Sequence, residues 1–127
     1  MYLRKVLDQL IRYFDAEKNY YNDPVIREEL SIQYKGRYDS MLTDISKASN
    51  EERLDAIDYL DGVLEECRKQ EKVADDNFET YRVREDLGTK FQKELLEIRG
   101  KIAEIEGYKR AINEYLNKKG TERWVKL

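Results

Sequence analysis

Residues 91–116 read FQKELLEIRGKIAEIEGYKRAINEYL and form the most regular apolar pattern in the chain. The large apolar residues here recur at steps near three and four, the spacing of one helix face in a coiled coil. The pattern predicts a helix over 77–118, about 60 Å long at 1.5 Å per residue, that projects or bends at Gly88. The seam consists of Tyr81, Phe91, Leu95, Ile98, Ile102, Ile105, Ile112 and Leu116, with Gly88 and Lys109 at two further positions.

Two helices are predicted in the first half of the chain. Apolar residues between Leu3 and Phe14 recur at helical steps, which indicates one buried face of a helix over 2–21. The sequence Asn-Asp-Pro at 22–24 interrupts this pattern. Asp is a good N-cap, and Pro suits the first helical position, where its missing N–H has no partner to lose. A second helix is therefore expected over 24–47.

Capping signals place the later helix boundaries. The sequence Ser-Asn-Glu-Glu at 49–52 has the order of a capping box and predicts a helix over 50–72. A further start is expected near Asp75 and Asp76, so that the last helix begins at 77. Gly120 is expected to end that helix at 118 and to leave a tail over 119–127.

No stretch alternates apolar and polar residues between turn signals, so no sheet is expected. Short connections favour antiparallel neighbouring helices. A chain of 127 residues has room for one domain of ordinary size. The sequence therefore predicts an all-α fold, a single domain over 1–127. It is expected to be an antiparallel bundle of about four helices with a long, coiled-coil-like helix at the C-terminus.

The composition argues against catalysis. The chain has no His and one Cys, which excludes an imidazole base, a Cys-His nucleophile and a site of several thiolates. It has no glycine-rich phosphate loop, and a slender bundle offers few pockets that could shift a carboxyl pKa. We expect a protein that is not an enzyme and that uses no cofactor and no metal.

Cysteine content and apolar runs bear on location. A lone Cys cannot form an internal disulfide, so a reducing cytoplasm is the simplest location, and Cys67 is expected to be a small core residue. No apolar run approaches the roughly 20 residues of a membrane-spanning helix, and the first 14 residues lack the unbroken apolar core of a signal peptide. A cytoplasmic protein without a membrane partner is expected.

The predicted third helix carries an acidic face. Seven carboxylates lie between Glu51 and Glu66, against a single cation, Arg53. Neighbours on one helix face are about 5–6 Å apart, which is near the spacing of phosphates along a nucleic-acid strand, so a basic surface that grips phosphates could bind them instead. The alternative is an ordinary solvated face. The candidate partner-binding residues are Glu51, Asp55, Asp58, Asp61, Glu65 and Glu66.

Small residues form a stripe on the predicted last helix, opposite its apolar seam. Gly in a helix interior costs about 1 kcal/mol relative to Ala, and removing side chains lets another helix approach closely. The stripe predicts a face for a partner helix or for a second copy of the chain. The alternatives are that the bundle itself covers it, or that the glycines lie on a tolerant solvent face. It consists of Leu96, Gly100, Ala103, Gly107 and Ala111, flanked by Tyr108 and Tyr115.

The C-terminal residues have the opposite charge. Residues 108–127 contain six basic and two acidic side chains, a net charge of +4, with aromatic rings among them. This combination occurs in proteins that bind single strands, but cations near a helix C-terminus also favour the helix dipole, and the whole chain has a net charge of −3. The candidate nucleic-acid contacts are Lys118, Lys119, Arg123, Trp124 and Lys126.

Three functions remain open from the sequence. The first is a protein–protein interaction module, an inhibitor or adaptor that blocks a macromolecular partner, for example a phage- or plasmid-type inhibitor of a nucleic-acid-binding host enzyme. The second is a self-associating coiled-coil protein of an assembly. The third is a weak nucleic-acid binder that uses the basic C-terminus. The first is the leading hypothesis, because a small, highly charged chain without catalytic groups can act by occupying a surface.

Overall fold

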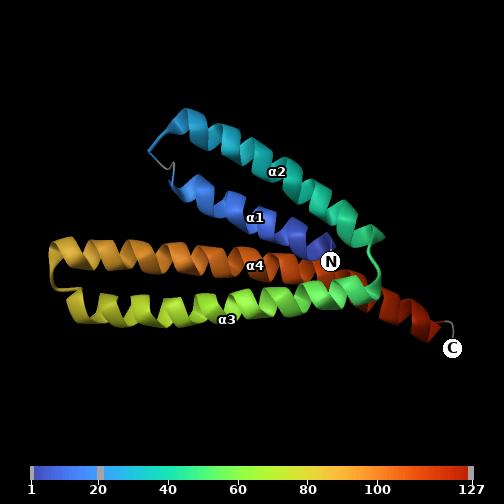
Figure 1. The fold of residues 1–127 in the computed structure, drawn as a ribbon. Coiled ribbons are helices and arrows are strands. Elements are labelled where there is room, and N and C mark those ends of the chain that lie inside the picture. Colours follow the sequence, from blue (N-terminus) through green and yellow to red (C-terminus); the bar gives the residue numbers. More distant parts are fainter. Residues whose placement is uncertain (1, 20–21, 126–127) are drawn as a thin grey trace. The chain divides into compact units, whose positions relative to one another are not determined.

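A computed structural model of the chain contains four helices and, in its described part, no strand (Figure 1). The backbone is described for residues 2–19 and 22–125, and side chains for 2–17 and 22–116. The helices are α1 (Tyr2–Asn19), α2 (Pro24–Lys47), α3 (Asn50–Tyr81) and α4 (Glu85–Val125). The predicted all-α helical bundle is confirmed.

The chain divides into two compact units. The first consists of Met1–Tyr59 and Arg110–Leu127, and the second of Leu60–Lys109. The first unit therefore contains α1, α2 and the start of α3, together with the last part of α4. The second unit contains the remainder of α3 and α4.

In the first unit α1 lies alongside α2 (Figure 1). Leu3, Leu7 and Leu10 of α1 are fully buried, because steps of three and four place them on one face of the helix. Asp23 is the N-cap of α2, and its carboxylate accepts a hydrogen bond from the backbone N–H of Ile26. Further core side chains of this unit are Ile11, Met41, Ile45, Ala56 and Ile112.

In the second unit α3 and α4 run antiparallel as a hairpin (Figure 1). Its core consists of apolar side chains from both helices, and an ion pair between Arg68 and Glu106 crosses from one helix to the other. At the closed end of the hairpin the rings of Tyr81 and Phe91 lie 5.4 Å apart. The core side chains are Leu60, Leu64, Cys67, Ala74, Leu95, Ile105 and Tyr108.

The turn between α3 and α4 lies at 82–84, so α3 ends nine residues later and α4 begins eight residues later than predicted. The predicted break near Asp75 and Asp76 is wrong because neither Gly nor Pro interrupts the helix there, and a capping sequence alone does not stop it. A single helix from 77 to 118 is wrong for the same reason. Tyr81 therefore ends α3 and is not part of the α4 seam.

Gly88 marks the turn rather than a bend within a helix. It lies in the first turn of α4, and its N–H donates to the carbonyl of Arg84 at 2.7 Å. A Cβ at this position would lie 3.0 Å from the backbone oxygen of Arg82. Glycine is therefore needed for the chain to reverse direction this tightly.

The predicted end of the last helix at 118 is also wrong. α4 continues through Gly120 to Val125. One Gly costs a helix only about 1 kcal/mol, and its neighbours Lys119, Glu122 and Arg123 are residue types that favour helices. Position 21, where the first helix was expected to end, is outside the described residues, and α1 ends at Asn19.

Candidate protein-binding surfaces

In the first unit the predicted acidic residues of α3 lie opposite its buried side. Ala56 is fully buried, and Glu51 and Asp58 project away from it, exposed and without an ion-pair partner within the described side chains. Asp55 is half-buried, and its carboxylate lies 4.0 Å from the Nε of Arg4. This part of α3 therefore presents two solvated carboxylates and one with a weakly placed cation.

In the second unit most of the predicted acidic residues are neutralised. Asp61 forms an ion pair with Lys109 across the hairpin, and Glu65 lies 3.8 Å from Lys69 on the same helix. Glu66 is exposed and has no ion pair in the described part of the chain. Sequence reasoning could not foresee the pair with Lys109, because it depends on the register of two helices.

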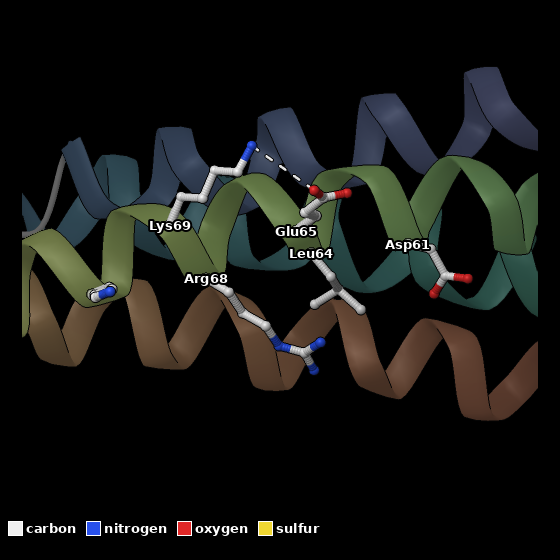
Figure 2. Close-up of a pocket in the computed structure, with 6 residues that line it drawn as sticks. Asp61, Leu64, Glu65, Arg68 and Lys69 are labelled. Carbon is white, nitrogen blue, oxygen red and sulfur yellow. Dashed lines mark ion pairs between the residues drawn. The ribbon is translucent and has the colours of Figure 1, made fainter.

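Figure 2 shows the residues that line an open groove of α3, among them Asp61, Glu65 and Lys69. Arg68 is also paired, since its Nη2 donates to Glu106 at 3.0 Å. Only one apolar side chain, Leu64, contributes to the lining. Apart from Lys72, each charged side chain of this groove therefore already has an ion-pair partner among the described residues. The lining residues are Asp61, Leu64, Glu65, Arg68, Lys69 and Lys72.

Arg53 is the charged side chain that the structure buries, at 1% exposure among the described residues. Its Nε and Nη2 donate to the carbonyl of Ile45 at 3.0 and 2.8 Å, and Nη2 also donates to Ser46 at 3.1 Å. Its Nη1 donates to Asn50 at 2.9 Å, and the guanidinium lies 4.3 Å from the centre of the Tyr115 ring. No described carboxylate forms an ion pair with it.

The role of Arg53 is to join three helices of the first unit. The carbonyls at the end of α2 carry the negative end of the helix dipole, so a cation here is stabilised by that dipole as well as by hydrogen bonds. The sequence contains a signal for the burial of Arg53. Arg53 is seven residues before the apolar Leu60, which places it on the buried side of an otherwise acidic helix.

The small-residue stripe of α4 is open at its start. Leu96 is 60% exposed, and a Cβ at Gly100 would meet no atom within 4 Å. Ala103 is exposed, whereas Gly107 and Ala111 are half-buried.

The two tyrosines that were expected to flank the stripe do not border an open surface. Tyr108 is fully buried in the second unit, and Tyr115 of the first unit is half-buried against Arg53. The physical reason is the helical period. Tyr108 is three residues after Ile105 and four residues before Ile112, which are both buried, and these spacings place it on the same side of α4.

The predicted nucleic-acid contacts cannot be placed in the same way. Lys118, Lys119, Arg123 and Trp124 belong to the helical backbone of α4, but their side chains lie outside the described ones, as does Lys126 altogether.

A second groove of the hairpin was missed by sequence reasoning. It lies between α3 and α4 within the second unit, and Val73, which contributes to it, is 60% exposed. No signal in a single helix reveals it, because its two walls come from segments about 20 residues apart. It is lined by Glu66, Lys69, Gln70, Val73, Ala74, Asn77, Glu94 and Ile98.

Tyr59 is a titratable group of the first unit whose pKa is shifted. Burial raises the pKa of its phenol above the ordinary value of 10.0, and the hydrogen bond that it donates to Asp8 at 3.1 Å acts in the same direction, while Arg4 and Arg12 oppose it. A phenol with this pKa stays protonated at neutral pH. It fastens α3 to α1 in the first unit.

The described residues also bear on metal binding and on membrane insertion. No group of three or more Cys, Asp or Glu side chains is arranged to hold a metal ion there. None of the described helices is both long enough and apolar enough to cross a membrane.

Comparison with known proteins adds no relative. A scan against protein-family models, a search of curated proteins and a search of solved structures each find no match to this chain.

Proposed function

We propose that this chain is a non-enzymatic protein that binds a macromolecular partner, as an inhibitor or adaptor, through the carboxylates of α3. The observation that carries the proposal is the exposure of Glu51 and Asp58 opposite the buried Ala56, with no ion pair to either carboxylate from the side chains that the structure describes. Charged groups in this state are available to a partner without breaking an existing contact. A non-enzymatic role is supported by the absence of His and by carboxylates that lie on open helix surface.

The partner surface that fits these groups is basic, such as one that normally binds a nucleic-acid backbone. The neutralised carboxylates do not prevent this. Exposed ion pairs such as Asp55 with Arg4 and Glu65 with Lys69 are worth about 0–1 kcal/mol, so Lys or Arg of a partner can replace the internal cation. The most specific form of the proposal is that the protein is an inhibitor, of phage or plasmid type, that occupies the nucleic-acid-binding surface of a host enzyme.

The test reverses the two free carboxylates. The chain with Glu51→Lys and Asp58→Lys is compared with wild type as bait for proteins of the cell that produces it. The matched control is Glu28→Lys with Glu29→Lys, which makes the same change of charge at two exposed positions of α2. We expect a basic protein that the α3 variant fails to capture, that the control retains, and that double-stranded DNA displaces. Identical captured proteins for all three baits would contradict the proposal.

A second candidate function is self-association through α4. The observation that favours it is the open start of the stripe, where Leu96 is 60% exposed and Gly100 has space around it. Gly100→Leu would hold a partner helix away. Gly62→Leu is the control, because Gly62 also lies in a helix of the second unit with no atom within 4 Å of a Cβ. Sedimentation should show an oligomer that only Gly100→Leu dissociates, and a strict monomer would exclude this function.

A further inference from the structure

The two edges of the α3–α4 hairpin in the second unit differ in kind. On one edge ion pairs join the helices, with Arg68 to Glu106 at 3.0 Å and Arg99 to Glu71 at 3.2 Å. On the other edge lies the groove around Val73, and among its described lining residues no ion pair joins α3 to α4. We call it the Val73 groove. Its edge of the hairpin is therefore not closed by charged side chains.

The floor of the Val73 groove is apolar. Ala74 is buried and Ile98 is half-buried, while Val73 stands at its rim with 60% of its surface in water. Gln70 and Asn77 supply amide groups along the α3 wall. An exposed β-branched side chain beside a partly covered Ile is the surface that an apolar side chain of a partner can bury.

Charge is placed at the two ends of the Val73 groove. Glu66 and Glu94 have no ion-pair partner within the described residues, whereas the remaining charged lining residue, Lys69, is neutralised by Glu65 at 3.8 Å. The register of the antiparallel helices follows from two contacts, Tyr81 with Phe91 and Asp61 with Lys109. In this register Glu94 of α4 is level with about residue 77 of α3. Glu66 and Glu94 are therefore separated by about 11 residues of helix, or roughly 16 Å.

We propose that the Val73 groove binds an amphipathic helix of a partner protein. The helix carries apolar residues over about three turns and a Lys or Arg at each end of that stretch. The apolar residues cover Val73 and Ile98, and the two cations meet Glu66 and Glu94. This names a partner chemistry for the binding role proposed above and rests on that role, but it uses a site that contains neither Glu51 nor Asp58.

The experiment uses the full chain and a displayed library of 18-residue helical peptides. The central positions at helical spacing vary among apolar residues, and the end positions vary among Lys, Arg, Glu, Gln and Ser. Peptides are selected on the wild-type chain and scored on two matched variants, Val73→Glu and Val25→Glu. Both replace an exposed valine, which is 60% exposed at position 73 and 68% exposed at position 25, but Val25 does not line the groove.

The expected peptides have an apolar centre and a cation at both ends. Val73→Glu should weaken their binding by about tenfold or more, and Val25→Glu should not change it. Enrichment of peptides with neutral or acidic ends would overturn the proposal. It would also be overturned if the selected peptides bind both variants equally, or if selection on wild type enriches no peptide relative to Val73→Glu. Far-UV circular dichroism of both variants confirms that each is folded.

A charge exchange gives a result that unfolding cannot imitate. The chain with Glu66→Lys and Glu94→Lys should lose the cation-ended peptide and bind the same peptide with Glu at both ends. An unchanged preference would overturn the proposal. The variant with Glu51→Lys and Asp58→Lys should bind the selected peptide as wild type does, so failure of the groove and failure of the α3 carboxylates give different results.

Discussion

At the scale of single residues, Arg53 contributes most to the first unit. Its guanidinium satisfies two carbonyls at the end of α2 and the side chain of Asn50, and it stacks on Tyr115. Buried polar groups are costly when they are left without partners. The same residue therefore fixes how α2 ends, how α3 begins and where α4 passes in this unit.

Arg53→Met keeps the length of the side chain and removes its donors, so the carbonyl of Ser46 loses the guanidinium, and the carbonyl of Ile45 retains the N–H of Ala48 at 3.3 Å. We expect the free energy of unfolding to fall by about 2–4 kcal/mol, measured by urea denaturation. Arg68→Met is the control, because its partner Glu106 is exposed to solvent, and it should change stability by less than about 1 kcal/mol. Equal effects of the two substitutions on the free energy of unfolding would show that the buried hydrogen bonds of Arg53 do not stabilise the first unit more than an exposed ion pair does.

Tyr59 predicts a pH dependence. Its folded pKa is raised by burial and by Asp8, so its contribution to stability is complete below the unfolded pKa near 10 and is lost as the pH rises through the higher folded pKa. Tyr59→Phe should cost about 1 kcal/mol at pH 7, and the difference from wild type should shrink above pH 10. A difference that stays constant across this range would contradict the assignment.

At the scale of helices, Gly88 determines the turn of the second unit. A methyl group there meets backbone atoms of Tyr81 and Arg82 between 3.0 and 3.2 Å, and backbone cannot move aside as a flexible side chain can. Gly88→Ala should therefore lower the free energy of unfolding by about 1 kcal/mol or more, even though Ala favours helices.

Gly62→Ala is the matched control for that substitution, since a Cβ at Gly62 meets no atom within 4 Å. It should raise stability by about 0.5–1 kcal/mol. Thermal unfolding of both variants measures the difference. Stabilisation by both substitutions would show that the turn does not require glycine.

The helix boundaries that could be predicted are those set by local chemistry. Asp23 with Pro24 fixes the start of α2 at the expected residue, and Ser49 accepts a hydrogen bond from the N–H of Glu52 at the start of α3. Local signals were misleading where they compete with continuation of a helix, as at Asp75 and Gly120. The sequence predicts a helix that projects or bends at Gly88, but the role of this residue in the turn depends on the backbone of Arg82, which only the folded turn brings near.

The candidate sites show the same division. Helical periodicity places Glu51 and Asp58 opposite the core, as the sequence predicts, because that direction belongs to one helix. The ion pair of Asp61 with Lys109 and the Val73 groove require the register of two helices, which no pattern within one segment contains. Tyr108 is a different case, because its spacing from Ile105 and Ile112 within α4 already indicates the buried side.

At the scale of the whole molecule, charge is distributed unevenly between the two units. Residues 60–109 contain 13 acidic and 10 basic side chains, a net charge of −3, which equals that of the whole chain. The first unit is therefore formally neutral, because its acidic residues are balanced by the basic C-terminal ones. Both proposed partners, a basic surface and a cation-ended helix, have the charge that favours approach to such a protein.

The most direct test of the central claim is the salt dependence of binding to the captured partner. The dissociation constant is measured at low and at high ionic strength for wild type and for the chain with Glu51→Lys and Asp58→Lys. If the carboxylates of α3 carry the interaction, wild-type binding should weaken by about tenfold or more as salt screens it, and the variant should bind weakly at both. Wild-type binding that is independent of salt and equal to that of the variant would contradict the account.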